Sequence, residues 1–243
     1  MSPALRIGAK LPSSGPLARQ VPLLESARLA EEADFDSVWV SDHVVMMRDH
    51  ASPYPFSSDG KMSWDPEYPW HDPLIAMAMC AAVTERIEIG VAVLIVPMRN
   101  PVILAKQLAS LDALSDGRVV VGAGAGWLAE EFDALGASFQ TRGERLDAPH
   151  VVVIDPRISF GQPVVAGTGI RTSVLAAGVA AIAAESARAG RVIPGRVVIR
   201  VAGPTPSVAG QLAGLQEVGV TDVVVDVNWD NGGPRQTVEM LRG

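Results

Sequence analysis

The chain has 243 residues, of which 48% are hydrophobic and 19% charged, and its formal net charge is −7. This composition is typical of a globular α/β protein, and the negative charge argues against a nucleic-acid-binding protein, which needs a basic surface. The single cysteine, Cys80, excludes an internal disulfide. The chain shows neither the run of about 20 apolar residues of a membrane span nor the apolar core of a signal peptide. We therefore expect a cytoplasmic protein without nucleic-acid or membrane partners.

The first half of the chain alternates short β-type runs with segments whose apolar residues recur at helical spacing. Asp72 and Asn100 each stand before a proline at the start of such a segment, which is a typical helix start. This alternation predicts parallel strands joined by right-handed helical crossovers. The predicted strands are 5–11, 35–44, 86–96 and 117–127, and the predicted helices are 17–33, 72–84 and 100–115.

The end of the chain returns to this alternation, but the middle does not. Residues 142–167 begin like a helix, meet Pro149, and then offer two short strand candidates, 151–154 and 163–166. Because a barrel of eight βα units takes about 250 residues, we predict a single α/β domain that forms a TIM-type (β/α)₈ barrel one βα unit short. An open doubly wound sheet is the alternative. The later predicted strands are 196–203 and 221–229, and the later predicted helices are 172–190, 205–219 and 234–243.

A long loop at 45–70 follows the second predicted strand and is rich in Pro, Ser, Asp and aromatic residues. A loop of this length in a compact domain is usually functional or disordered. In a barrel it emerges at the C-terminal face, where active sites lie. The aromatic residues favour an ordered lid over a flat ligand, and an unstructured surface excursion is the alternative. They are Tyr54, Phe56, Trp64, Tyr68 and Trp70.

Three polar residues, Ser41, Asp42 and His43, end the second predicted strand just before this loop. A histidine at the mouth of a barrel suits proton transfer or a hydrogen bond to a cofactor ring, because imidazole exchanges protons near neutral pH. The alternative is a histidine that only closes the end of the strand.

A glycine-rich stretch, "VGAGAGW" (121–127), ends the fourth predicted strand. Gly122 and Gly124 would let the backbone approach a ring or a phosphate closely, and tight packing between strand and helix is the alternative. The stretch is not the dinucleotide-binding fingerprint, because Trp127 stands where that motif needs its third glycine. We expect the paired acids of the next segment, "AEEF" (129–132), to form a solvated helical face.

A second glycine turn, "GTGIRTSVLAAG" (167–178), lies between a predicted strand and a predicted helix. Backbone N–H groups at the start of a helix can face an anion. Arg171 would add positive charge and Thr168 a hydroxyl beside Gly167 and Gly169, although an ordinary helix cap is the alternative. The sequence shows no constellation of metal ligands.

Several of these motifs, in this order, resemble the luciferase-like flavin and deazaflavin oxidoreductases. The resemblance is carried by "FDSVWVSDHVV", "WHDPLIAMAMCAAVTERIEIGVAVLIVPMRNPVILAKQ" and "GRVVVGAGAGWLAEEF". It covers about residues 5–147 and resumes over about 176–242, and it is closest to the short actinobacterial members that use coenzyme F420. It implies a TIM barrel with the cofactor at the C-terminal ends of the strands.

The resemblance also implies roles for individual residues. His43 matches the histidine that meets the deazaflavin ring, and Asp42 matches the acid beside it. Residues 93–95 match a strand end that bulges behind the ring, often with a non-proline cis peptide bond. The cofactor-binding residues that follow from the resemblance are Ser41, Val93, Leu94, Ile95, Gly122 and Gly124.

The segment at 150–176 does not follow this family. Its sequence, "HVVVIDPRISFGQPVVAGTGIRTSVLA", resembles the start of a small antitoxin-like domain of unknown function. It replaces about one and a half βα units of the family. Because it still ends in a strand, a glycine turn and a helix, we hypothesise that Gly167, Gly169 and Arg171 partly restore an anion site.

These features together predict an oxidoreductase that transfers a hydride between F420 and an organic substrate, with His43 as proton donor or ring-orienting group. An FMN-dependent monooxygenase on the same scaffold is the first alternative. The second alternative is a catalytically inactive barrel, which is either an evolutionary relic or a protein that binds a partner through its open edge. An antitoxin-like DNA-binding protein is disfavoured by the negative charge. Members of the family often form homodimers, so a homodimer is a further expectation by analogy.

Overall fold

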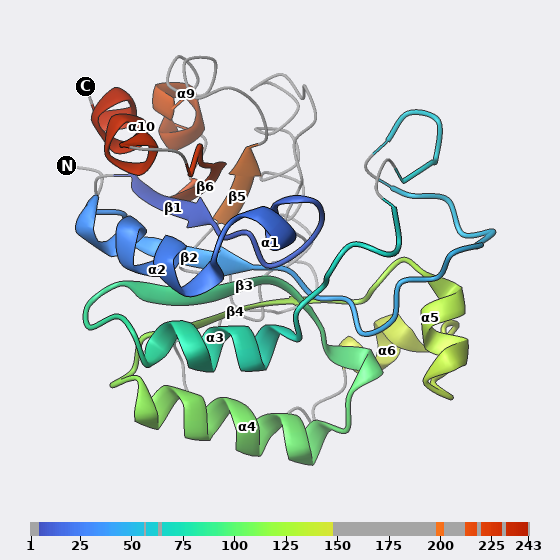
Figure 1. The fold of residues 1–243 in the computed structure, drawn as a ribbon. Coiled ribbons are helices and arrows are strands. Elements are labelled where there is room, and N and C mark those ends of the chain that lie inside the picture. The colour runs from blue at the N-terminus through green and yellow to red at the C-terminus, as the bar shows by residue number, and fades with distance from the viewer. Residues whose placement is uncertain are drawn as a thin grey trace.

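The computed structural model describes residues 5–55, 57–62, 65–147, 198–201, 212–217, 220–229 and 232–242. Within these residues, six parallel strands form one sheet in the order β4-β3-β2-β1-β6-β5 (Figure 1). This order is that of strands followed around a barrel, and it confirms the predicted α/β fold with parallel strands. The strands are β1 (Arg6–Lys10), β2 (Ser37–Val40), β3 (Glu88–Ile95), β4 (Val119–Gly124), β5 (Val198–Val201) and β6 (Asp222–Asp226).

The chain between β4 and β5 includes residues 148–197, which lie outside the described residues. The strand candidates 151–154 and 163–166 and the predicted helix 172–190 fall on this segment. The prediction that the barrel is one βα unit short also depends on it, and therefore stays a prediction.

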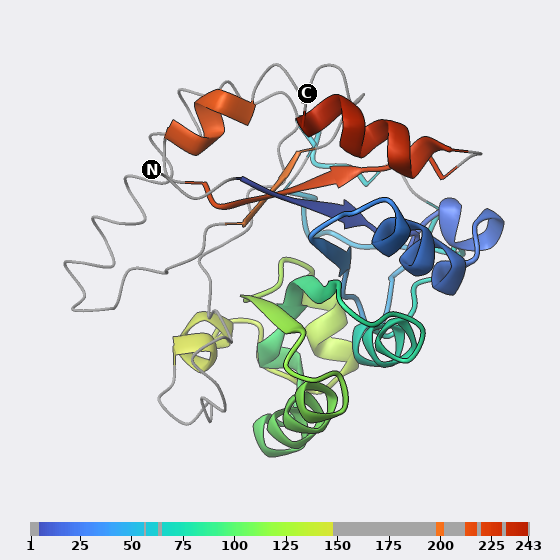
Figure 2. The same cartoon turned by 90° about the vertical axis from the view of Figure 1, so that its left-hand side faces the viewer.

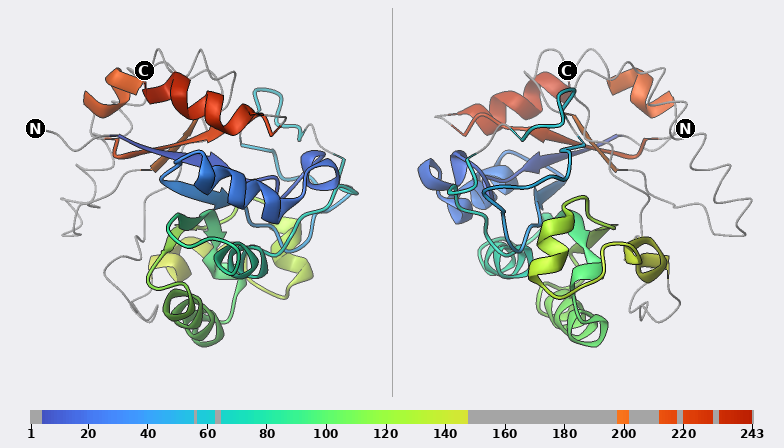
Figure 3. Two further views of the ribbon diagram at one scale, coloured as in Figure 1. Left: turned by 60° about the vertical axis from the view of Figure 1, so that its left-hand side comes forward. Right: turned by 90° about the vertical axis from the view of Figure 1, so that its right-hand side faces the viewer.

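Helices cover the outer face of the sheet. Along that face α10, α2, α3 and α4 contact one another in turn, following the curve of the strands (Figures 2 and 3). No helix in the described part of the chain is long and apolar enough to cross a membrane. The longer helices are α2 (Leu23–Glu32), α3 (Pro73–Ala81), α4 (Pro101–Leu114) and α10 (Gly233–Arg242); the shorter ones are α1 (Leu17–Gln20), η1 (Val96–Met98), α5 (Ala129–Ala134), α6 (Arg142–Asp147) and α9 (Leu212–Glu217).

The predicted starts of α3 and α4 are confirmed, because both helices begin at the expected proline with a capping side chain before it. The carboxylate of Asp72 accepts hydrogen bonds from Leu74 N–H and Ile75 N–H, at 2.9 and 3.0 Å. Asn100 does the same at the start of α4. Such caps satisfy N–H groups that have no partner within the helix.

The prediction of one helix over 17–33 is wrong, because the structure has two helices there. Val21, between α1 and α2, is extended, with φ −119° and ψ 122°. The ring of a proline disfavours helical backbone at the residue before it, so Pro22 interrupts the helix at Val21. Pro22 itself then precedes the first residue of α2.

The inner face of the sheet is filled by the indole ring of Trp39, which is 1% exposed. Its Nε1–H donates to Ser37 Oγ at 2.8 Å, and its ring packs with Val120 and Val224. Glycine occupies the two neighbouring strands, because a Cβ atom at Gly8 would lie 2.5 Å from the Trp39 ring and one at Gly90 would lie 2.4 Å from it. The indole therefore requires glycine on both sides.

This requirement gives a prediction for stability. Gly90→Ala should lower the free energy of unfolding by about 1–3 kcal/mol, because the added methyl group overpacks the ring of Trp39. Gly143→Ala is the matched control: Gly143 lies within α6, a Cβ there would meet no atom within 4 Å, and alanine is the better helix former. Urea unfolding of the three proteins measures both effects, and a Gly90→Ala protein as stable as the parent would contradict the packing argument.

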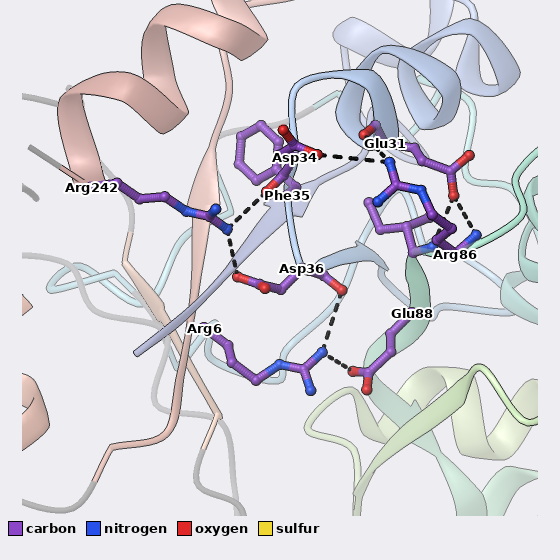
Figure 4. Close-up of a pocket in the computed structure, with 9 residues that line it drawn as sticks. Arg6, Glu31, Asp34, Phe35, Asp36, Arg86, Glu88 and Arg242 are labelled. Carbon is purple, nitrogen blue, oxygen red and sulfur yellow. Dashed lines mark hydrogen bonds and ion pairs between the residues drawn. The ribbon is translucent and has the colours of Figure 1, made fainter. Parts of the chain in front are cut away.

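The N-terminal ends of the strands carry a hollow of about 440 Å³ lined mainly by charged side chains (Figure 4). Arg6 pairs with Glu88 at 2.7 Å, and Arg242 pairs with Asp36 at 3.1 Å. Glu31 at the end of α2 accepts hydrogen bonds from the backbone N–H groups of residues 85–87. Burial opposes the effect, but these bonds and the nearby Arg86 guanidinium lower the pKa of Glu31. The charged side chains of the hollow thus pair with one another and with backbone groups. The hollow lies at the end of the sheet opposite to the end where TIM-barrel active sites lie.

Candidate functional site

The C-terminal ends of β2, β3 and β4 meet at one end of the sheet, beside α5 and the long loop between β2 and α3 (Figure 1). This arrangement follows from parallel pairing, because neighbouring strands end at the same edge. It brings together the motif 41–43, the segment 93–95 and Gly122 and Gly124, which are far apart in the sequence. The other predicted cofactor-binding residues, Gly167, Thr168, Gly169 and Arg171, lie outside the described residues.

The end of β3 bulges where the sequence predicted it. The peptide bond between Ala92 and Val93 is cis, and the pairing with β4 shifts between Ala92 and Leu94. Leu94 and Ile95 are buried, whereas the side chain of Val93 packs against β4. A Cβ atom at Gly124 would lie only 2.4 Å from Val93 Cγ2, so the bulge requires glycine at this position of β4. The bulge and its cis peptide bond are confirmed, and contact with a cofactor stays a prediction.

Asp42 is buried at the end of β2 and ties it to the end of β3. Its carboxylate pairs with both terminal nitrogens of the Arg99 guanidinium, at 2.6 and 2.7 Å, and accepts Ile95 N–H at 2.8 Å. Burial raises the pKa of Asp42, although the Arg99 guanidinium and the Ile95 N–H act in the opposite direction. Arg99 could not be predicted from the sequence, because it follows the third strand and pairs with a residue 57 positions earlier.

Ser41 connects this region to the end of β1. Its backbone N–H donates to Ser13 Oγ at 3.3 Å, and Lys10 Nζ donates to the same hydroxyl oxygen at 3.2 Å. Ser13 is fully buried. The hydroxyl of Ser13 thus joins the last residue of β1 to the residue that begins the Ser41–His43 motif.

The imidazole of His43 lies between an acid and two tryptophans. Nδ1 is 2.7 Å from Glu131 Oε2, and the side chain is 9% exposed. The ring meets Trp70 edge to face at a centroid distance of 4.8 Å and Trp127 at 5.9 Å. Trp70 belongs to the predicted lid, whereas Trp127 was not predicted to belong to the site.

Glu131 is the functional residue that the sequence analysis missed. Its side chain is 0% exposed, so the expectation that the acids of 129–132 form a solvated helical face is wrong for this residue. Leu128 and Phe132, four residues apart, are both fully buried, and helical spacing puts Glu131 on the face that they define. That spacing was visible in the sequence and could have placed Glu131 inward.

Both acids of this segment hold the start of the long loop. Glu131 Oε1 accepts from Val44 N–H and Val45 N–H, at 2.5 and 3.0 Å. Glu130 Oε1 accepts from Ala51 N–H and Ser52 N–H, at 2.6 and 3.1 Å. The loop is therefore attached to α5 through four backbone N–H groups.

The loop is attached at its other end as well. His71 N–H donates to Ser13 O at 3.0 Å, and Gly15 N–H donates to Pro69 O at 3.1 Å. Between these ends, the ring of Tyr54 meets Trp127 edge to face at 5.2 Å. Phe56 and Trp64 lie outside the described residues, so the structure describes only part of the predicted aromatic lid.

The family of the chain follows from comparison with known proteins. A model of the luciferase-like monooxygenase family matches residues 6–148, which is more than half of the 243 residues. The chain belongs to this family. All side chains of the site described above, from Lys10 to Glu131, lie within the matched residues of this luciferase-like chain. Among the residues that the structure describes, no group of three or more His, Cys, Asp and Glu side chains could hold a metal ion.

Individual relatives extend this result. An uncharacterized protein of Mycobacterium tuberculosis is 33% identical over 121 residues, which are 50% of this chain and 42% of that protein. The F420-dependent glucose-6-phosphate dehydrogenase of Amycolatopsis mediterranei is 34% identical over 124 residues, 51% of this chain and 32% of the enzyme. The chain thus spans less than half the length of these curated relatives.

A solved structure has a similar fold. The crystal structure of apo-MsnO8 is 16% identical and has a TM-score of 0.57, and the match covers 98% of this chain and 97% of that one. The luciferase-like chain therefore has the fold of a TIM barrel, as predicted. The F420-using branch stays a prediction.

The attachment of the loop gives a prediction for pH dependence. Slight burial acts in the opposite direction, but hydrogen bonds from Ser52 and from the N–H groups of residues 51 and 52 lower the pKa of Glu130 from 4.5 to about 2. Because the folded value lies below the unfolded one, the stabilisation is complete above pH 4.5 and is lost as the pH falls toward about 2. The difference in free energy of unfolding between the parent and Glu130→Gln should therefore be larger at about pH 6 than at about pH 3.

Chemical denaturation at both pH values measures this difference, because other titrating groups contribute equally to the two proteins. A difference that does not change with pH would contradict the role of Glu130 as an ionised anchor of the loop.

Proposed function

We propose that this luciferase-like chain is an oxidoreductase that transfers a hydride between coenzyme F420 and an organic substrate, with FMN as the alternative cofactor. The observation that carries the proposal is the position of His43, held by Glu131 at the strand ends beside the bulge of β3. The relative from Amycolatopsis mediterranei is an F420-dependent glucose-6-phosphate dehydrogenase, which favours F420 over FMN. The proposal also gives Gly167, Thr168, Gly169 and Arg171 the role of binding an anionic part of the cofactor.

The residues present fit a flat ring at this place. On the inner face, Trp39 and Val120 fill the sheet at one level. Beyond them toward the C-terminal ends, Ala92 on β3 pairs with Gly122 on β4, and Gly124 follows two residues later on the same face. Ala92 and Gly122 carry no bulky side chain, whereas the space over Gly124 is taken by the side chain of Val93. Ala92, Gly122 and the bulge of β3 would hold such a ring, and His43, which follows the neighbouring strand β2, would be the group to exchange a proton with it.

When bound, a deazaflavin or flavin ring supplies the hydride chemistry. The protein's own part is orientation, proton exchange and exclusion of water. His43 is the group suited to hold or move a proton, and Trp70 and Trp127 cover it. Asp42 is fully engaged by Arg99 and Ile95, so we assign it the role of fixing the bulge rather than of touching the substrate.

The first test is titration of the purified chain with F420 and, separately, with FMN, measured by quenching of fluorescence, with circular dichroism as a check of folding. We expect micromolar binding of F420, an affinity of about −8 kcal/mol, by a cooperatively folded chain. Binding of FMN alone would favour the monooxygenase alternative. Binding of neither ring by a folded chain would contradict the proposed function and favour the inactive barrel.

The role of His43 gives a second prediction. His43→Ala should weaken F420 binding about tenfold, equivalent to about 1.4 kcal/mol, because one hydrogen bond to the ring is lost. His71→Ala is the control, since His71 is an exposed residue just before α3 and should bind like the parent. Equal affinities for all three proteins would remove His43 from the ring-binding site.

A further inference from the structure

The carboxylate of Glu131 divides its two oxygen atoms between two tasks. Oε1 accepts the backbone N–H groups of Val44 and Val45, and Oε2 lies 2.7 Å from Nδ1 of His43. The side chain is completely removed from water. A buried carboxylate requires hydrogen-bond partners, and these three donors supply them.

This geometry decides where the hydrogen of His43 resides. A neutral imidazole carries one hydrogen, on either Nδ1 or Nε2, and an ionised carboxylate can only accept. At 2.7 Å from Glu131 Oε2, Nδ1 must therefore carry the hydrogen. The nitrogen that remains to take up or release a further proton is Nε2.

We infer that Glu131 is a positioning residue that fixes His43 in the Nδ1–H form and leaves Nε2 as the nitrogen that exchanges a proton with the bound ligand. The assignment of the hydrogen stands on the structure of the protein alone. Its consequence for the ligand rests on the proposed function.

The carboxylate of Glu131 couples the tautomer of His43 to the conformation of the loop that follows it. The two N–H groups that Glu131 holds belong to Val44 and Val45, the residues that directly follow His43. The acid therefore fixes both the ring and the backbone from which the ring extends. An acid that holds one ring nitrogen of a histidine restricts both the orientation and the tautomer of that ring.

A single substitution separates this role from general stabilisation. In Glu131→Gln the side chain keeps its shape but has one oxygen and one NH₂ group. The N–H groups of Val44 and Val45 need an acceptor, so the amide oxygen remains with them and the NH₂ group faces Nδ1. Nδ1 must then accept, and the hydrogen of His43 moves to Nε2.

The matched control is Glu130→Gln. Glu130 is the preceding residue of α5 and also accepts two loop N–H groups, those of Ala51 and Ser52. It holds the loop at a place away from His43. Its substitution therefore tests loss of loop attachment without a change of the group at Nδ1.

The experiment is ¹⁵N nuclear magnetic resonance of the imidazole rings in protein labelled at histidine, at a mildly alkaline pH and without cofactor. The chain has four histidines, so His43→Ala identifies the signals of His43 by their loss. We expect a pyrrole-like Nδ1 and a pyridine-like Nε2 in the parent and in Glu130→Gln, and the reverse assignment in Glu131→Gln. Hydrogen on Nε2 in the parent, or an unchanged pattern in Glu131→Gln, would overturn the inference.

If Glu131→Gln does not fold, Glu131→Asp replaces it, because aspartate retains a carboxylate. The Nδ1–H form in that variant would support the inference, and the Nε2–H form would contradict it. The parent spectrum is informative in either case.

Cofactor binding provides the second measurement. If Nε2 meets the ligand, Glu131→Gln should change the affinity for F420 about tenfold, whereas Glu130→Gln should change it less than threefold. Absence of F420 binding by the parent would count against the proposed function and leave the tautomer result unaffected. The expected tautomers with equal F420 affinities in both variants would contradict the proton-exchanging role of Nε2.

Discussion

Two buried carboxylates, that of Asp42 just after β2 and that of Glu131 on α5, hold the end of β2 in place. Asp42 binds the end of β3 through Ile95 N–H and the side chain of Arg99, and Glu131 binds the next residues from α5. His43 lies between the two acids in the sequence and is itself hydrogen-bonded to one of them. Because loss of one partner leaves a buried charge uncompensated, each contact is costly to break, by about 3–5 kcal/mol for a buried ion pair. The histidine is therefore placed by groups that cannot easily move.

The contacts of these two acids depend on how the inner face of the sheet is packed. Trp39 fills this face and can do so only because Gly8 and Gly90 stand beside it on β1 and β3. Small residues follow toward the C-terminal ends of the strands, where Ala92 of β3 pairs with Gly122 of β4. A bulky ring at one level and small residues at the next separate the packed interior from the end at which a ligand can approach. The position of the glycines thus shapes the fold and the site together.

The elements of the fold could be predicted from the sequence because their causes are local. Proline after Asp72 or Asn100 favours the start of a helix, and alternation of strands and helices favours parallel pairing. The split of the first helix was missed although its cause, Pro22, is also local. The motif at 41–43 was singled out by its place at the end of a predicted strand, whereas the bulge of β3 was found through resemblance to a family.

The contacts that build the site could not be read in the same way, because each joins distant parts of the chain. Glu131 lies 88 positions from His43, and Arg99 lies 57 positions from Asp42. Nothing near Arg99 in the sequence distinguishes it from an exposed arginine. Glu131 had a weak signal, since Leu128 and Phe132 mark a buried helical face, but two adjacent acids normally indicate a surface. The contact of Glu131 with His43 is visible only when the end of β2 is placed opposite α5.

Charges are used differently at the two ends of the sheet. At the N-terminal end, pairs such as Arg6–Glu88 and Asp36–Arg242 remain partly exposed to water, and surface ion pairs contribute about 0–1 kcal/mol each. At the C-terminal end the acids are buried and their partners are few and fixed. Mutation should therefore be tolerated at the first end and penalised at the second, although both are rich in charge. All the buried contacts of the second end fall within residues 6–148, the part that matches the family. Substitutions among these buried contacts can thus test ring binding separately from the question of whether Gly167–Gly169 and Arg171 bind an anion.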